Sequence, residues 1–171
     1  MIQESRLIYR QPTTADVQRY YDIFADPQTN LYNPFGPITG IEVAEKNIEK
    51  TIAHWAAYGF GAWAVATTEH PEDVIGFGGI QYKMYGADER LNLGYRFREA
   101  SWGRGYATEM AKHAIEMAFN TLRLPEVFAI VRPVNKPSIH VLEKSGMVLT
   151  GRLDDVPGQE WSLVYKIASS R

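Results

Sequence analysis

The sequence predicts a single mixed α/β domain with seven strands and four helices. Its 171 residues are enough to enclose one hydrophobic core. Stretches in which apolar residues alternate are interleaved with stretches in which they recur every three or four positions. Together these patterns predict the order β-α-α-β-β-β-α-β-α-β-β. No internal repeat, low-complexity tract or linker-like stretch interrupts that order.

The chain opens with a short strand, Arg6–Pro12, which ends at proline. A helix follows, capped by Thr13 or Thr14 and ended by Pro27. Its apolar positions recur at helical spacing: Val17, Tyr20, Tyr21 and Phe24.

A loop rich in proline, glycine and aromatic residues, NLYNPFGPITG, precedes the second helix. Thr39 and Glu42 form a capping-box pattern for that helix, which runs to about Tyr58. Its apolar positions include Val43, Ile48, Ile52 and Trp55.

The middle of the chain predicts three strands, Gly61–Thr68, Val74–Met84 and Leu91–Phe97. Glycines at 76, 78 and 79 mark a bulge or a close approach in the second of them. The third is a half-buried strand, because its apolar residues alternate with Asn92, Gly94 and Arg96.

The last part predicts a helix, a buried strand, a short helix and two closing strands. The first helix carries an apolar stripe: Met110, Ala111, Ala114, Ile115, Ala118 and Phe119. The remaining elements are Glu126–Pro133, the short helix Asn135–Gly146, Met147–Leu153 and Glu160–Ile167.

Composition excludes several classes of function. The net charge is −2 and there is no basic run, so nucleic acid is not an expected partner. No apolar run approaches the ~20 residues of a membrane span, and the N-terminus has no apolar signal core, so we expect a cytoplasmic protein with no membrane contact. The chain has no cysteine and its four histidines lack metal-ligand spacing, so no metal is expected.

Two glycines, Gly103 and Gly105, lie between a predicted strand and a predicted helix. Glycine lets a ligand approach the backbone closely, and the first amides of a helix favour phosphate. Arg98 and Arg104 supply nearby charge. The alternative is a glycine-rich connection with two solvated arginines. The Walker pattern G-x-x-x-x-G-K-[ST] is absent, and GRGYAT lacks the third glycine of the dinucleotide fingerprint.

Two segments carry a resemblance to a known family. WGRGYATEM, Trp102–Met110, resembles the pyrophosphate-binding motif of the GNAT superfamily of N-acetyltransferases. NKPSIHVLEKSGM, Asn135–Met147, resembles that family's N-x-x-S-x-x-x-x-E-K-x-G-F segment. Nearly the whole chain is similar in element order to the RimJ/RimL-type ribosomal-protein branch. The resemblance implies a mostly antiparallel seven-stranded sheet with a splay between the fourth and fifth strands.

The resemblance also implies a reaction. A GNAT enzyme transfers the acetyl group of acetyl-CoA to a primary amine by direct attack. The acceptor would be a protein N-terminus, such as that of a ribosomal protein, or a small-molecule amine, and the enzyme a monomer or homodimer. Leu142 and Asn92 stand where relatives carry a catalytic Tyr and Glu. An acyl-CoA-binding module without catalytic activity is therefore the alternative.

The residue roles follow from the same resemblance. The cosubstrate acetyl-CoA would be bound by Phe97, Arg98, Gly103, Arg104, Gly105, Tyr106, Ala107, Thr108, Asn135 and Ser138. Ser138 is the candidate proton donor to the leaving thiolate, or a plain helix-start serine, and Asn135 can cap the short helix. Tyr32, Asn33 and Phe35 would wall the acceptor site, or simply pack onto the core. No strong candidate for the base emerges, because Glu160 and Tyr82 are better explained as surface residues.

Overall fold

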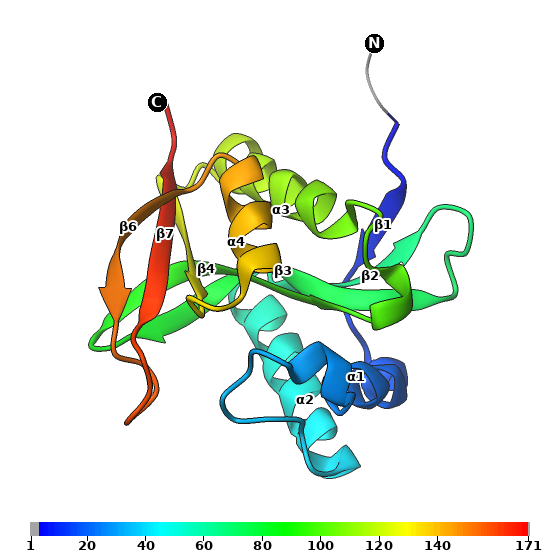
Figure 1. Ribbon diagram of the computed structural model, residues 1–171. Coiled ribbons are helices and arrows are strands. Elements are labelled where there is room, and N and C mark those ends of the chain that lie inside the picture. The colour runs from blue at the N-terminus through cyan, green and yellow to red at the C-terminus, as the bar shows by residue number, and fades with distance from the viewer. Residues whose placement is uncertain (1–3, 171) are drawn as a thin grey trace. The chain divides into compact units, whose positions relative to one another are not determined.

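A computed structural model describes residues 4–170, and every predicted strand and helix occurs in it in the predicted order (Figure 1). Short 3-10 turns cover Thr14–Asp16, Pro27–Asn30 and Glu99–Ser101, and a π-helical turn covers Met117–Thr121. The main elements are β1 (Leu7–Arg10), α1 (Val17–Phe24), α2 (Ile41–Tyr58), β2 (Ala62–Thr67), β3 (Val74–Tyr85), β4 (Asp88–Phe97), α3 (Tyr106–Glu116), β5 (Glu126–Val131), α4 (Lys136–Lys144), β6 (Val148–Leu153) and β7 (Ser162–Ala168).

The strands form a mixed sheet in the order β1-β2-β3-β4-β5-β7-β6. β1 with β2, β5 with β7, and β6 with β7 are antiparallel, whereas β4 and β5 are parallel. The parallel pair needs a crossover connection, and α3 lies between the two strands in the chain. Their register pairs Asn92 with Phe128, a short contact that agrees with the expected splay. The predicted fold class is confirmed.

The described chain divides into two compact units. The first unit comprises residues 4–31, Gly36–Gly78 and Tyr95–Tyr106. The second comprises Tyr32–Phe35, Gly79–Gly94 and residues 107–170. No helix among the described residues is long and apolar enough to cross a bilayer.

The core of the first unit forms where α1 and α2 contribute their apolar faces. Tyr20 and Phe24 stack at 3.9 Å between ring centres, and the Tyr20 ring lies 5.2 Å from that of Phe77. The α1 residue that is most deeply buried is Ile23, which the sequence pattern did not include. The buried core residues are Ile23, Ile48, Ala64, Val74 and Phe77.

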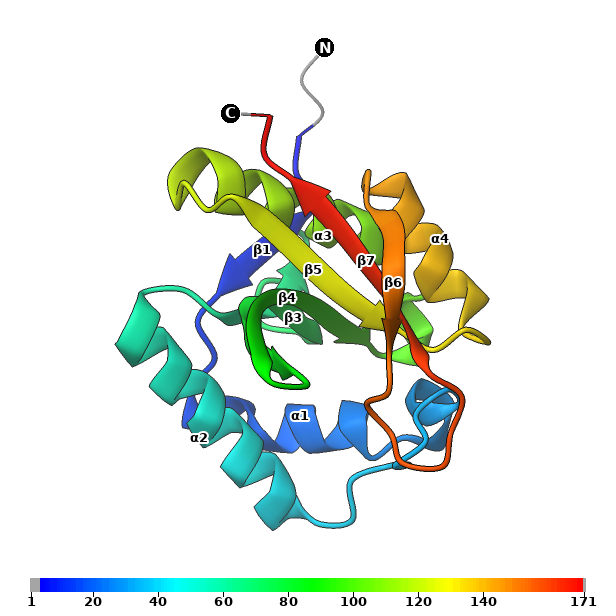
Figure 2. The same cartoon turned by 90° about the vertical axis from the view of Figure 1, so that its left-hand side faces the viewer.

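The second unit buries the apolar stripe of α3 as predicted. Four of its positions in the helix proper are buried: Met110, Ala111, Ala114 and Ile115. β5 contributes Val127 and Ala129, and α4 contributes Leu142, which is only 2% exposed. Figure 2 shows β5, β7 and β6 side by side, in agreement with their hydrogen-bonded pairing.

The predicted start of α2 is wrong by one residue. The N-cap is Gly40, with no side-chain hydrogen bond, so Thr39 does not cap the helix. The carboxylate of Glu42 folds back over Gly40, where an added Cβ would meet its Oε1. Because that oxygen ends a flexible side chain, a larger residue at position 40 would only displace it. The predicted end at Tyr58 is confirmed, because Gly59 adopts a left-handed φ of 74°.

The glycines of β3 include one close approach between strands. A Cβ on Gly76 would lie 2.5 Å from the Phe97 ring and 2.9 Å from the Arg96 carbonyl oxygen. Gly76 therefore allows the side chain of Phe97 to cross this position. The expectation of a close approach is confirmed there.

Candidate active site

The turn before α3 contains two glycines in left-handed conformations. β4 ends at Phe97, one turn of 3-10 helix covers Glu99–Ser101, and α3 begins at Tyr106. Between them, Gly103 has a φ of 77° and Gly105 a φ of 79°. The predicted order of strand, glycine turn and helix is confirmed, whereas the intervening 3-10 turn was not expected.

These two glycines are needed for backbone conformation and not for tight packing. A Cβ on Gly103 would meet no atom within 4 Å, and one on Gly105 would lie 3.6 Å from Arg6 Nη2. A left-handed backbone costs a residue with a side chain about 1–3 kcal/mol. The same lack of side chains leaves space beside the backbone. The first amides of α3 lack helical partners and carry partial positive charge, so the residues present fit a phosphate group.

Arg98, one of the two arginines expected to supply charge, is held by an acidic residue. Its guanidinium donates to both carboxylate oxygens of Asp73, at 3.1 and 2.7 Å, and its Nε donates to Ser101 Oγ at 3.2 Å. The hydrogen bonds from Arg98 hold the pKa of Asp73 below its usual value. Asp73 is shared between two arginines, because Arg19 Nη1 lies 3.1 Å from its Oδ1. The role of Arg98 in ligand binding stays a prediction.

Two side chains hold the glycine turn in place. The indole Nε1 of Trp102 donates to the Phe97 carbonyl oxygen at 2.9 Å. Arg6 Nη1 donates to the Arg104 carbonyl oxygen at 2.9 Å, and its guanidinium carbon lies 4.8 Å from the centre of the Tyr106 ring. Sequence analysis missed Arg6. It lies 98 residues before Arg104, so no local pattern connects the two.

The start of α4 is built as the sequence predicted. Asn135 is the N-cap, and its Oδ1 accepts a hydrogen bond from the Ser138 amide at 3.2 Å. Pro137 occupies the first turn, where its missing N–H has no cost. The Ser138 side chain is half-buried, and its role as a proton donor stays a prediction. Leu142 is part of the core and offers no donor.

Asn92 and Tyr85 form a buried polar pair. Asn92 was expected on the polar face of its strand, but it is buried, and its Oδ1 accepts a hydrogen bond from the Tyr85 hydroxyl at 2.5 Å. Burial raises the pKa of Tyr85 strongly, an effect that Arg90 opposes and Asp155 reinforces. A thiolate with a pKa near ~8.5 would not take a proton readily from such a group. The pair is therefore no substitute for the missing acid.

The loop Tyr32–Phe35 is largely exposed. Phe35 is 75% exposed and Tyr32 39%, so the Phe35 ring does not pack onto the core. The loop has internal order, because the Phe35 amide donates to Asn33 Oδ1 at 3.1 Å. An exposed aromatic ring remains available to a ligand, and a role in acceptor binding stays a prediction. Glu160 is exposed in the loop before β7, since that strand begins at Ser162 and not at the predicted position.

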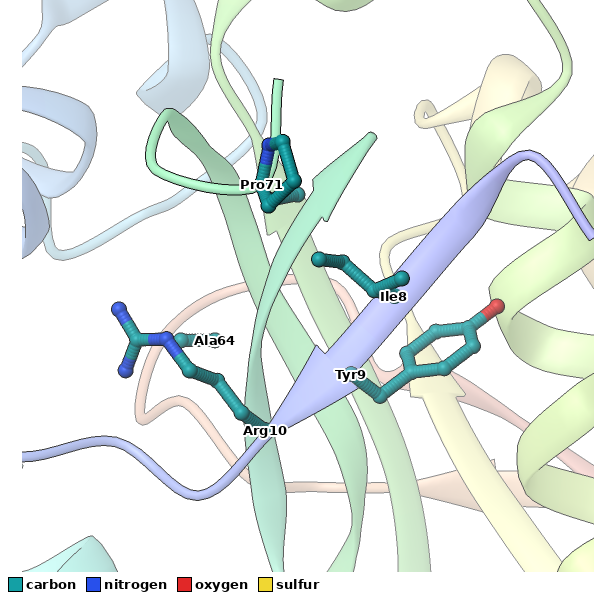
Figure 3. Close-up of a pocket in the computed structure, with 6 residues that line it drawn as sticks. Ile8, Tyr9, Arg10, Ala64 and Pro71 are labelled. Carbon is teal, nitrogen blue, oxygen red and sulfur yellow. The ribbon is translucent and has the colours of Figure 1, made fainter. Parts of the chain in front are cut away.

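A small pocket lies along β1 and β2, lined by Ile8, Tyr9, Arg10, Ala64, Ala66 and Pro71 (Figure 3). Its volume of about 40 Å³ has room for no more than a few water molecules. It is therefore too small for a substrate of the expected size.

Sequence comparison finds relatives over most of the chain. The family profile described as "Acetyltransferase (GNAT) domain" matches residues 6–148. YnaD of Bacillus subtilis (strain 168), named an uncharacterized N-acetyltransferase, is 28% identical over 162 residues, or 94% of this chain and 91% of that protein. The uncharacterized protein YkkB of the same organism is 33% identical over 90 residues, so the match covers 53% of this chain and 52% of YkkB.

Solved structures share the fold. An acetyltransferase from Agrobacterium tumefaciens str. C58 has a TM-score of 0.80 at 29% identity, over 98% of this chain and 94% of that one. RimJ of Mycobacterium smegmatis, in complex with CoA-disulfide, has a TM-score of 0.75 at 23% identity, over 95% and 82% of the chains. Spermidine N-acetyltransferase from Vibrio cholerae, in complex with CoA and spermine, has a TM-score of 0.75 at 18% identity, over 96% of each chain.

Proposed function

Because the chain belongs to the acetyltransferase (GNAT) domain family, we propose that it transfers an acetyl group from acetyl-CoA to a primary amine. Membership of the family and the names of its relatives make it an acyltransferase, as the resemblance implied. We propose three further points: that acetyl-CoA is the donor, that a primary amine is the acceptor, and that the whole chain forms one such domain. The observation that carries the donor is the turn at Gly103 and Gly105, whose left-handed backbone leads directly into α3.

The chain's own residues would perform three tasks. The amides of residues 103–107 would hold the diphosphate of acetyl-CoA, with Arg98, Arg104 and Thr108 nearby and Asn135 beside the pantetheine arm. An amide on the last part of β4, up to Phe97, would donate to the thioester carbonyl as negative charge develops on its oxygen. Ser138 would protonate the departing thiolate, directly or through water.

Turnover with a panel of amines tests the proposal. Purified protein and acetyl-CoA should release CoA thiol in the presence of an acceptor amine, and the product should gain one acetyl group by mass spectrometry. The panel should include N-terminal peptides of ribosomal proteins and polyamines, because RimJ and a spermidine N-acetyltransferase are both structural neighbours. Tight CoA binding with no turnover on any amine would favour the alternative of a binding module without activity.

The acceptor is proposed to contact Tyr32, Asn33 and Phe35. Phe35→Ala should raise the KM for the acceptor severalfold and leave the affinity for acetyl-CoA unchanged, because the exposed ring is a binding contact and not a core residue. Met84→Ala is the control, since Met84 is an apolar side chain that is 54% exposed and is not among the proposed acceptor contacts. Unchanged acceptor kinetics in Phe35→Ala would exclude that ring from the acceptor site.

A further inference from the structure

Arg6 brings a charged side chain from the N-terminal segment to the turn that leads into α3. Its backbone immediately precedes β1, and its side chain is exposed. The guanidinium donates a hydrogen bond to the Arg104 carbonyl and lies over the Tyr106 ring. Its Nη2 lies 3.6 Å from the point that a Cβ on Gly105 would occupy.

We propose that Arg6 is a cofactor-positioning residue, which holds the glycine turn in its binding conformation and places its guanidinium on the diphosphate of CoA. This inference rests on the proposed function, since the diphosphate is that of the acetyl donor. It adds to the site a residue that the family motif does not contain, because WGRGYATEM begins at Trp102.

The geometry of a guanidinium allows both parts of this role at once. The group is planar, its edge carries five N–H donors, and its face stacks on aromatic rings. In Arg6 one edge donor reaches the Arg104 carbonyl while the group lies at the Tyr106 ring. Those two contacts fix residues on both sides of Gly105, and therefore the direction of the amides between them.

The neighbouring arginines make different contacts. Arg98 is held on Asp73 by two hydrogen bonds. Arg104 contributes its carbonyl group to the contact with Arg6, and its own side chain is exposed. A ligand phosphate at the Gly105 amide would lie close to Arg6 Nη2, which is 3.6 Å from the Cβ position of that glycine. Charge-assisted hydrogen bonds to phosphate are about twice as strong as neutral ones.

The test compares CoA binding to wild-type protein, Arg6→Ala, Arg6→Lys and Arg152→Ala by calorimetry. Arg152 is an exposed arginine on β6, so its removal changes net charge equally without touching the turn. We expect Arg6→Ala to weaken CoA binding about tenfold. Arg6→Lys should fall between Arg6→Ala and wild type, because an ammonium keeps the charge but cannot stack and donate in the same plane. Arg152→Ala should bind as wild type does.

Dephospho-CoA identifies the phosphate that Arg6 contacts. Dephospho-CoA lacks the 3′-phosphate and keeps the diphosphate. The affinity of Arg6→Ala relative to wild type should therefore fall by the same factor for CoA and for dephospho-CoA. A loss that disappears with dephospho-CoA would assign Arg6 to the 3′-phosphate and overturn the proposal. In turnover, Arg6→Ala should raise the KM for acetyl-CoA and leave kcat and the acceptor KM near wild type.

The remaining outcomes separate this inference from the proposed function. Wild-type protein that does not bind CoA would refute the proposed function itself. Wild-type protein that binds CoA while Arg6→Ala binds equally well would refute only the role of Arg6. A lower melting temperature of Arg6→Ala with unchanged CoA affinity would also refute that role, since it would show a purely structural contact.

Discussion

Gly105 illustrates how a single residue can serve conformation and binding together. Its φ of 79° is one that residues with side chains rarely adopt, yet the space around its Cβ position holds only the end of a flexible arginine. Steric crowding by the protein therefore does not explain the glycine. The left-handed backbone and the space that a ligand would need explain why this residue is glycine.

Gly105→Val should weaken CoA binding more than tenfold. The new side chain strains the backbone by about 1–3 kcal/mol and projects into the space where a diphosphate would approach. Gly59→Val is a matched control, because Gly59 has a similar φ of 74° and no atom lies within 4 Å of its Cβ position. Both variants should lose similar thermal stability, but only Gly105→Val should lose CoA affinity by calorimetry. Equal affinity in the two variants would exclude the turn as the diphosphate site.

Ser138→Ala should lower kcat by about tenfold to a hundredfold and barely change the affinity for acetyl-CoA. The gain from a proton donor is modest because a CoA thiolate, with a pKa near ~8.5, leaves tolerably well at neutral pH. The cap bond from Asn135 uses the Ser138 backbone amide and survives loss of the hydroxyl. The melting temperature of Ser138→Ala, measured beside kcat, should show that the variant is folded at the assay temperature. Full kcat under conditions in which the chemical step limits the rate would assign proton transfer to water.

At the scale of elements, the connection from β1 to α1 is stabilised by a buried carboxylate. Asp16 is 4% exposed and accepts two hydrogen bonds from Arg10, at 2.7 and 2.8 Å, and one from the Thr13 amide at 2.8 Å. Thr13 in turn accepts from the Ala15 amide, which completes a capping box. The sequence offered Thr13 or Thr14 as the cap of the helix, and Thr13 caps the 3-10 turn that precedes it. The ion pair that orients the turn was not predicted.

Asp16→Asn should destabilise the protein by about 1.5–3 kcal/mol at pH 7, the range for hydrogen bonds to a charged group. Burial alone would raise the pKa of Asp16, but the hydrogen bonds from Arg10 and Thr13 outweigh it and lower the pKa. A lowered folded-state pKa adds stability that is complete above the unfolded value of ~3.9 and is lost as pH falls through the folded value.

Urea unfolding at several pH values tests this linkage. The difference in unfolding free energy between wild type and Asp16→Asn should be largest near neutral pH and shrink below about pH 4, where the wild-type carboxylate gains its proton. Asp154→Asn, which changes an exposed carboxylate, should follow the wild-type curve. A difference that stays constant with pH would show that the charge of Asp16 is not the source of the stability.

At the scale of the whole molecule, β3 and β4 each contribute residues to both compact units. A ligand that binds the folded chain and not the unfolded chain stabilises the folded state and raises the melting temperature of the protein. CoA at a hundred times its Kd adds about 2.7 kcal/mol. For a chain of this size, each kcal/mol corresponds to about 2–4 °C, so we expect a shift of about 5–10 °C. A scanning calorimetry trace that does not move with CoA concentration would contradict specific binding.

The order of elements, the glycine turn and the cap of α4 were all predictable from the sequence. Each depends on residues a few positions apart. The stripe of α3 repeats at the helical period, Gly103 and Gly105 lie at the junction of two patterns, and Asn135 lies three residues before the amide that it caps. Local rules of backbone geometry are sufficient for such features, and for this reason the motif that carries the family resemblance could be recognised directly.

Only the tertiary structure decided which charged and polar groups meet. Arg98, which directly follows β4, forms an ion pair with Asp73, 25 residues earlier, and the sequence did not predict that pair. Asn92 is buried, and its hydrogen-bond partner Tyr85 lies on the neighbouring strand β3. Arg6 reaches the turn at Arg104 across 98 residues. Such contacts are set by how strands pair and helices pack over long separations, and no short window of residues contains that information.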